Sequence, residues 1–234
     1  MTTASAFPTR LSMTQVLICG AAIVTLSMGI RHGFGLWLQP ITMERGWTRE
    51  HFAFAIAIQN ITWGVAGLFA GMVADRFGAY RVLLAGGVIY ALGLALMALA
   101  PTPLAFTATA GVLLGIAQAC TTYAVVYGVL GRNIAPAKRS WAMGVTAAAG
   151  SFGQFLMVPV ENGLINGTSF LGLRLDGVGW QSALFVLAAM ALLILPLAAG
   201  LRERGLEGGF ARPQQSIGAA LREAFAYPSF QLLM

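Results

Sequence analysis

Charged residues are scarce in this sequence. Asp, Glu, Lys and Arg make up 9% of its 234 residues, whereas an average soluble domain contains about 25%. Hydrophobic residues make up 58% of the chain. This composition excludes an ordinary soluble domain and indicates a protein that is embedded in a lipid bilayer.

The side chains that usually carry out catalysis are also rare. The sequence has two cysteines and two histidines, and Cys19 and Cys120 both lie in apolar segments without neighbouring metal ligands. We interpret these cysteines as packing residues. The sequence has no Ser/His/Asp set, Cys/His metal spacing, phosphate-binding loop or pair of membrane acids. We therefore expect neither an enzyme nor a protein that binds a metal or a cofactor.

Long apolar runs dominate the chain instead. A helix needs about 20 residues to cross the hydrocarbon core of a bilayer, and runs of this length recur six times. The predicted spans are 15–40, 50–74, 81–100, 104–130, 139–160 and 180–200. The first run lacks the cleavage site of a signal peptide and leads into five more, so we expect it to be retained. The predicted fold class is an all-α membrane protein with six transmembrane helices.

The connections suggest how the chain is divided. They are short except for the outer segment 161–179 and the inner segment 201–227, and the stretch 166–177 of the outer segment has no explanation at this level. The inner segment is rich in charged residues and glycine and ends in an amphipathic stretch, which is typical of a surface linker. The predicted parts are a cytoplasmic tail (1–14), a six-helix domain (15–200), a cytoplasmic linker (201–227) and the truncated start of a seventh helix (228–234).

The net charge of +6 is unevenly distributed. If the N-terminus is cytoplasmic, ten of the 14 Lys and Arg residues fall in inner segments, three fall in outer loops and Arg31 lies within a span. Cytoplasmic loops of membrane proteins carry an excess of Lys and Arg. We therefore predict a multi-pass protein of the plasma membrane, here a bacterial inner membrane, with a cytoplasmic N-terminus. Topology explains the positive charge, so no nucleic-acid partner is expected.

Polar side chains are concentrated in four of the six spans. The third span has Tyr90 as its only clearly polar side chain, and the sixth has polar residues only at its outer end. An unpaired polar group in hydrocarbon is costly, so polar residues should face one another or a watery cavity. We expect the first, second, fourth and fifth helices to line a cavity, and the third and sixth to be the most exposed to lipid.

Arg31 is the leading candidate for a substrate-binding residue. It lies nine residues before Pro40, roughly 14 Å from the predicted outer end of its helix. An arginine near a helix centre costs about 2.5 to 3.5 kcal/mol to insert. No Asp or Glu lies in the middle of any predicted span, so a carboxylate substrate is the natural partner. In the alternative, Arg31 is a structural cation that reaches outward to the headgroups.

Four polar residues are further candidates for hydrogen bonds to a substrate, namely Asn60, Gln118, Tyr123 and Gln154. Asn60 and its neighbour Gln59 lie at about the depth of Arg31. Each could instead be part of a helix contact. Because adjacent residues on one helix point in different directions, some of these polar residues must face away from the cavity.

A charged glycine motif marks the inner turn between the second and third spans. It reads G-x-x-x-D-R-x-G-x-x-R, with Gly71, Asp75, Arg76, Gly78 and Arg81 at the fixed positions. The motif and its place resemble the signature of the major facilitator superfamily. The resemblance implies a half-transporter of two inverted three-helix repeats and a conformational gate at this loop, which locks the two halves in the outward-open state. In the alternative, Arg76 and Arg81 are only cytoplasmic anchors.

Two looser motifs point to a subgroup of that family. Residues 29–49 and 132–154 are similar to the first span and an inner loop of the monocarboxylate porter and oxalate:formate antiporter-like group. The fifth span lacks the Gly-Pro pair of drug:proton antiporters, and the fourth lacks their membrane arginine, so drug export is less favoured.

The resemblance implies secondary active transport of a small organic anion, with a monocarboxylate as the expected substrate, by alternating access. The expected partners are the lipid bilayer, the anion and a missing C-terminal six-helix half; protons or a counter-anion remain open as coupling partners. The alternative is a truncated membrane fragment that does not transport, or a half-subunit that needs a partner.

Overall fold

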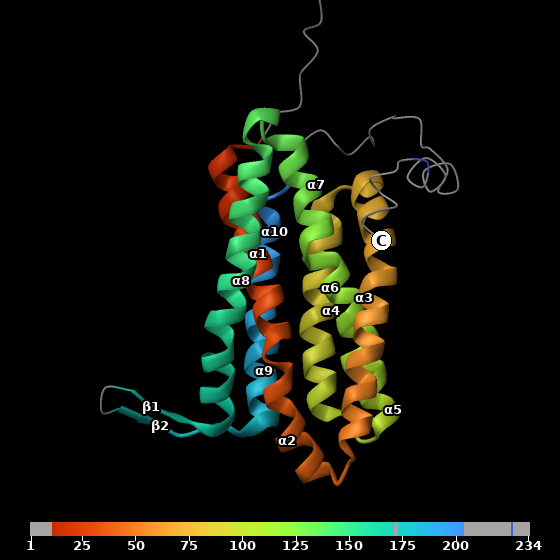
Figure 1. Cartoon of the computed structure of the whole chain (residues 1–234), viewed down its shortest axis with the longest axis vertical. Coiled ribbons are helices and arrows are strands. Elements are labelled where there is room, and N and C mark those ends of the chain that lie inside the picture. The colour runs from red at the N-terminus through yellow and green to blue at the C-terminus, as the bar shows by residue number, and fades with distance from the viewer. Residues whose placement is uncertain (1–10, 171–172, 204–225, 227–234) are drawn as a thin grey trace, which may run out of the picture.

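The computed structural model describes residues 11–170, 173–203 and 226. They form a bundle of long helices that run along the longest dimension of the molecule (Figure 1). The helices are α1 (Met13–His32), α2 (Phe34–Arg45), α3 (Arg49–Phe77), α4 (Ala79–Leu99), α5 (Pro103–Phe106), the π-helix η1 (Thr107–Leu113), α6 (Leu114–Thr121), α7 (Tyr123–Asn133), α8 (Pro136–Asn166), α9 (Gly179–Ala191) and α10 (Ile194–Ala199). The strands are β1 (Thr168–Phe170) and β2 (Leu173–Leu175).

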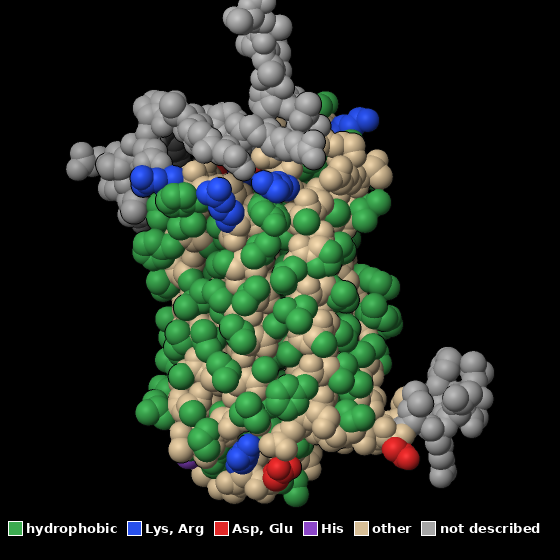
Figure 2. Space-filling view, turned by 180° about the vertical axis from the view of Figure 1, so that it is seen from behind, with side chains coloured by type: hydrophobic (Ala, Val, Ile, Leu, Met, Phe, Trp, Pro, Cys, Tyr) green, Lys and Arg blue, Asp and Glu red, His purple; other side chains and the backbone are tan. Residues whose placement is uncertain are grey.

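These elements confirm the prediction of six spans. By length and composition, six helical segments of the described chain can cross a membrane. They are Met13–Arg45, Arg49–Phe77, Ala79–Leu99, Pro103–Asn133, Pro136–Asn166 and Gly179–Ala199. Figure 2 shows a broad hydrophobic band across one face of the bundle, with charged side chains at its two ends. The predicted seventh helix and most of the predicted tail and linker lie outside the described residues.

The two ends of the bundle carry different features. We call the end with Leu11 and Glu203 the tail end, and the end with β1 and β2 the hairpin end (Figure 1). The two strands pair antiparallel, with Thr168 opposite Leu175. They lie within the stretch 166–177 that the sequence left unexplained, and they add a short hairpin to an otherwise helical fold.

Two helices run further toward the hairpin end than predicted. The first span does not end at Pro40, because α2 contains this proline and ends at Gly46, which has a φ of 66°. Likewise, α8 continues through Pro159 to Asn166 instead of ending at residue 160. Proline within a membrane helix is tolerated where neighbouring groups satisfy the freed backbone carbonyl. Arg31 and Glu161 consequently lie deeper in their helices than the sequence suggested.

Within the described half-bundle, the third and sixth helices are more buried than the second and fifth, and 39% of the most apolar stretch of the sixth is buried. Their exposure to lipid stays a prediction. Buried residues make up 56% of the most apolar stretch of α4, compared with 17% for α3 and 22% for α8. Glycines allow this burial, since Gly86 faces Cys120 and Gly93 faces Leu114 at distances that leave no room for a side chain. An apolar helix can therefore form the core of a half-bundle as readily as a lipid-facing surface.

Glycines also bring α1 and α8 into close contact along their length (Figure 1). A methyl group at Gly153 of α8 would collide with the backbone carbonyl of Thr25, and one at Gly29 of α1 would collide with Met157. Such contacts between small residues are how membrane helices approach each other closely. Gly111 of η1 and Gly115 of α6 pack in the same way against α3.

We predict that Gly153→Ala lowers the thermal stability of the protein, because inserting a methyl group into a packed contact costs about 1–3 kcal/mol. Gly144→Ala is the matched control on the same helix, since a methyl group there meets no described atom within 4 Å and alanine favours a helix. The midpoint of thermal unfolding in detergent measures both effects. Equal midpoints for the two variants would contradict the packing argument.

Candidate functional site

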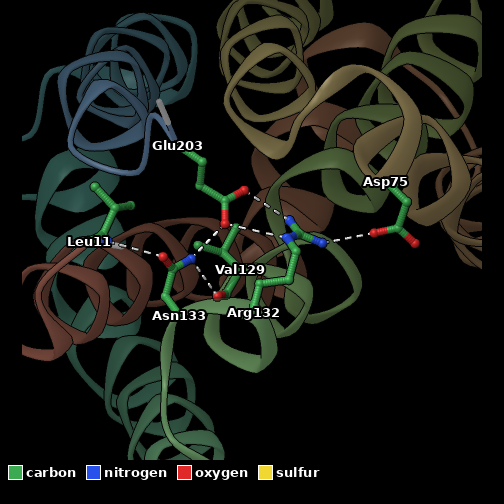
Figure 3. A network of polar contacts seen from close by, with 6 residues as sticks. All are labelled: Leu11, Asp75, Val129, Arg132, Asn133 and Glu203. Atoms are coloured by element: carbon green, nitrogen blue, oxygen red, sulfur yellow. Dashed lines mark hydrogen bonds and ion pairs between the residues drawn. The ribbon is translucent and has the colours of Figure 1, made fainter. Parts of the chain in front are cut away.

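An ion-pair network joins four segments at the tail end (Figure 3). Arg132 of α7 lies between two acids: its Nη1 is 2.8 Å from Asp75 Oδ1, and its Nη2 is 3.2 Å from Glu203 Oε2. Asn133 donates to Glu203 at 2.6 Å and accepts from the backbone of Leu11 at 3.2 Å. The network therefore ties the residue before α1, the end of α3, the end of α7 and the residues after α10 to one another.

The two acids differ in exposure. The side chain of Glu203 is 9% exposed, whereas that of Asp75 is 71% exposed. Glu203 accepts from both Nε and Nη2 of Arg132, which is the strong bidentate arrangement. In the sequence, Arg132 is one of the inner charges, and nothing marks Glu203 as its partner, because a partner 71 positions away leaves no local pattern.

The other motif residues lie around this network without joining it. Gly78 has a φ of 90° and forms the turn between α3 and α4. The guanidinium of Arg76 lies 5.4 Å from the ring centroid of Phe77, and Arg81 lines a small pocket at the same turn. A methyl group at Gly71 would meet no described atom within 4 Å. Within the described chain, the motif contributes one ion pair, made by Asp75.

A second polar cluster surrounds Arg31, which is half-buried where α1 faces α3. The Nη2 of Arg31 donates to Asn60 Oδ1 on α3, and the guanidinium lies 4.8 Å from the ring centroid of Trp63. Trp63 in turn donates to Thr122, at the break between α6 and α7, at 3.2 Å. Two predicted substrate-binding residues therefore lie in contact. Trp63 was missed, although it lies three positions after Asn60 and so shares its helix face.

Gln118 is packed inside the bundle and does not line an open cavity. It is fully buried, and neither polar atom of its side chain has a hydrogen-bond partner among the described residues. Tyr90 of α4 is also fully buried and donates to the backbone carbonyl of Ser27 at 2.8 Å. Tyr90 is thus the buried polar side chain by which α4 contacts α1, one turn before Arg31.

The remaining predicted residues lie apart from Arg31. The ring of Tyr123 packs on that of Tyr127, with centroids 5.3 Å apart, and its hydroxyl lies against Gly150 of α8. Gln154 is half-buried on α8. In the part of the chain that the structure describes, no hydrogen bond joins either residue to Arg31. Gln59, the neighbour of Asn60, is buried and donates to the Ala110 carbonyl at 2.7 Å, so it is a packing residue.

Glu161 corrects the expectation that the spans contain no deeply placed acid. It is fully buried in α8, its Oε2 accepts from Trp37 Nε1 at 3.1 Å, and its Oε1 has no described partner. The sequence predicted an outer loop for this residue because the apolar run stops at residue 160. Periodicity could have found it: the buried face of α8 is Ala142, Thr146, Gly150, Gly153, Met157, Glu161 and Ile165.

The hairpin end contains an open groove with a volume of about 590 Å³ between the exposed face of α2 and the start of α3. Its lining includes Gln39, Thr42, Trp47 and Arg49. None of the five predicted substrate-binding residues lines it.

Comparisons with known proteins place this geometry in a family. The sequence profile of the Major Facilitator Superfamily matches residues 17–233. Monocarboxylate transporter 11 of Mus musculus is 28% identical over 200 residues, which cover 86% of this chain and 42% of that protein. The Homo sapiens protein of the same name is 28% identical over 200 residues, covering 86% of this chain and 40% of that protein. The chain therefore spans about two fifths of the length of these relatives.

Other similarities are shorter or more distant. Multidrug resistance protein MdtH of Proteus mirabilis is 41% identical over 60 residues, or 26% of this chain and 15% of that protein. A crystal structure of the peptide transporter POT in complex with alafosfalin has a TM-score of 0.62 and 20% identity, covering 98% of this chain and 47% of that one. That likeness shows the transporter fold alone. Since the family profile matches nearly the whole chain, the chain belongs to the Major Facilitator Superfamily.

Proposed function

We propose that this chain is the N-terminal half of a secondary active transporter of a small organic anion, a monocarboxylate, and that it works by alternating access together with a C-terminal six-helix half. The observation that carries the proposal is Arg31, a guanidinium inside the bundle that forms no ion pair with any described acid. The 28% identity to monocarboxylate transporters 11 supports the same substrate class.

The surroundings of Arg31 suit a carboxylate ligand. Its described neighbours, the Asn60 carbonyl and the Trp63 ring, carry no charge to neutralise it. A guanidinium has five N–H donors in a planar fork that matches a carboxylate. The structure assigns only one hydrogen bond to Arg31, and its Nε is buried without a described partner. An anion that approaches from the open side of α3 would find both a charge and free donors.

The exposed faces of α3 and α8 support the proposal of a second half. Large hydrophobic residues stand out along α3 (Phe54, Ile61, Val65, Leu68, Phe69, Met72, Val73 and Phe77) and along α8 (Trp141, Val145, Phe152, Phe155, Leu156 and Val160). Lipid could cover these hydrophobic faces, but its hydrocarbon chains cannot form hydrogen bonds with Asn60, which is exposed on α3. A polar group at mid-span favours a watery cavity, which a partner half would enclose.

The charges at the two ends support a cytoplasmic tail end in a bacterial inner membrane. The turns at the tail end carry six basic residues, namely Arg76, Arg81, Arg132, Lys138, Arg139 and Arg202. The α2–α3 turn at the hairpin end carries Arg45 and Arg49, each beside an acid. The excess follows the positive-inside rule. In this orientation the Asp75 motif lies at the cytoplasmic surface, where we propose that it acts as a gate between the two halves.

Arg31→Gln is expected to weaken anion binding by about 10- to 100-fold, because a hydrogen bond to a charged group contributes about 1.5–3 kcal/mol. Arg31→Lys should retain part of the binding, since lysine keeps the charge but not the fork. Binding of labelled lactate to the complete, reconstituted transporter measures both. Arg45→Gln is the control, because Arg45 also stacks on a tryptophan, Trp180, but at the hairpin end.

Normal insertion of the Arg31→Gln protein together with unchanged lactate binding would contradict the proposed anion site. Loss of insertion together with loss of binding would assign Arg31 a structural role instead. Expression of the chain with and without the downstream half separates a transporter half from an inactive fragment: lactate uptake by the chain alone would contradict the need for a second half.

Asp75→Asn is expected to slow transport while leaving lactate binding and insertion intact, because Asp75 is an exposed partner at the edge of the network. Its ion pair with Arg132 is largely in water, so its loss costs the fold about 0–1 kcal/mol. Uptake rates and equilibrium binding, measured in parallel, distinguish the two effects. Asp176→Asn, an exposed acid at the hairpin end, is the control. An unchanged uptake rate for Asp75→Asn would rule out the gate.

A further inference from the structure

A small pocket at the tail end lies beside the ion-pair network and takes no part in the proposed anion site. Its volume is about 60 Å³, and it lies between the α3–α4 turn and the residues that follow α10. Its lining includes Phe77, Tyr80, Arg81, Arg202 and Glu203. None of the residues around Arg31 lines it. We call this feature the tail-end pocket.

Two arginines supply the positive charge of the tail-end pocket. The ring of Tyr80 holds one of them in place, because the guanidinium of Arg202 lies 5.6 Å from the ring centroid. Arg81 is exposed, and it makes no hydrogen bond, ion pair or ring contact with any described residue. Its guanidinium therefore keeps five N–H donors for a ligand, in a planar fork that matches the oxygens of a phosphate group.

The acid in the lining of the pocket is already paired. Glu203 Oε1 accepts from Arg132 Nε and from Asn133, and its Oε2 accepts from Arg132 Nη2 (Figure 3). Residues 75–81 and the tail-end network together carry four arginines, Arg76, Arg81, Arg132 and Arg202, and two acids, Asp75 and Glu203. This excess of positive charge favours an anionic ligand in the pocket.

The surface next to the tail-end pocket is apolar. Helices α4 and α10 pack against each other below it. The exposed residues within two turns of Arg81 along α4, and of Arg202 back along α10, are Ala85, Pro196 and Ala199. This surface belongs to α4 and α10, whereas the apolar faces that we assign to a second half belong to α3 and α8. A ligand on it would therefore not compete with the second half.

Charge and apolar surface together fit an amphiphilic ligand. On the face that Figure 2 shows, basic side chains border the hydrophobic band at the tail end, where the hydrocarbon of a bilayer gives way to its headgroups. A free phosphate ion would contact the arginines alone. A phospholipid would also cover the apolar surface along α4 and α10, and basic pockets between membrane helices bind acidic lipid headgroups.

We propose that the tail-end pocket binds the headgroup of an anionic phospholipid, with Arg81 and Arg202 on its phosphate and its acyl chains along α4 and α10. Both guanidinium groups would donate charge-assisted hydrogen bonds to the phosphate oxygens. The site lies apart from Arg31, and the proposal does not depend on the proposed transport function.

Native mass spectrometry of the complete protein in detergent measures lipid binding directly. The parent protein is expected to bind phosphatidylglycerol more tightly than phosphatidylethanolamine with the same acyl chains, because only phosphatidylglycerol carries a net negative charge. Arg81→Gln should weaken phosphatidylglycerol binding by about 10-fold, because a hydrogen bond between charged groups is lost. Lys138→Gln is the matched control, since Lys138 is exposed at the same end but does not line the pocket.

Arg81→Lys keeps the charge without the planar fork, so it should bind phosphatidylglycerol with intermediate affinity; it is the second test if the glutamine variant does not fold. An affinity equal to that of the parent in either Arg81 variant, or equal affinity of the parent for the two lipids, would overturn the site. An equal loss in Lys138→Gln would reduce the effect to net charge and overturn it as well. If inorganic phosphate displaces the lipid and raises the midpoint of thermal unfolding as much, the pocket binds free phosphate and the lipid proposal is wrong.

Discussion

The contact between α1 and α8 determines the arrangement of the polar interior. Gly29 and Gly153 let the two backbones approach until only glycine fits between them. At that separation Glu161 lies beneath Gly33 and reaches Trp37 on the other side of the junction. With one flank of α1 occupied by α8, Arg31 extends to Asn60 on α3. A wider spacing would admit side chains at these glycines and separate the acid from its donor.

Helix depth and periodicity were enough to predict part of the site. The position of Arg31 within an apolar run indicated a buried cation, and the shared depth of Asn60 indicated its neighbour. Gln59 and Asn60 could not be separated by sequence, because their side chains differ by about 100° around the helix and only the packing of α3 fixes that rotation. The structure buries Gln59 against the Ala110 carbonyl and leaves Asn60 facing Arg31.

Other features depend on tertiary contacts that composition does not encode. The apolar character of α4 fits a lipid-facing helix and a core helix equally well, and the glycines that distinguish them act only through Cys120 and Leu114. The limits of α8 were misjudged because a proline and a glutamate normally end an apolar run. Inside this bundle Pro159 stays in the helix, and Glu161 continues the same buried face as Gly150 and Met157.

In the tail-end network, Arg132 pairs with two acids that differ in burial, Glu203 and Asp75. Glu203 is buried and receives two hydrogen bonds from Arg132, so removing it would leave the partly buried Arg132 with only its exposed partner, Asp75, which is destabilising. Asp75 is mostly exposed and receives one, so its ion pair contributes little to the fold. Arg132 can therefore stay fixed by Glu203 while Asp75 exchanges one partner for another. The gate that we propose between two halves would need this combination, because the half must stay rigid while one exposed charge changes its contact.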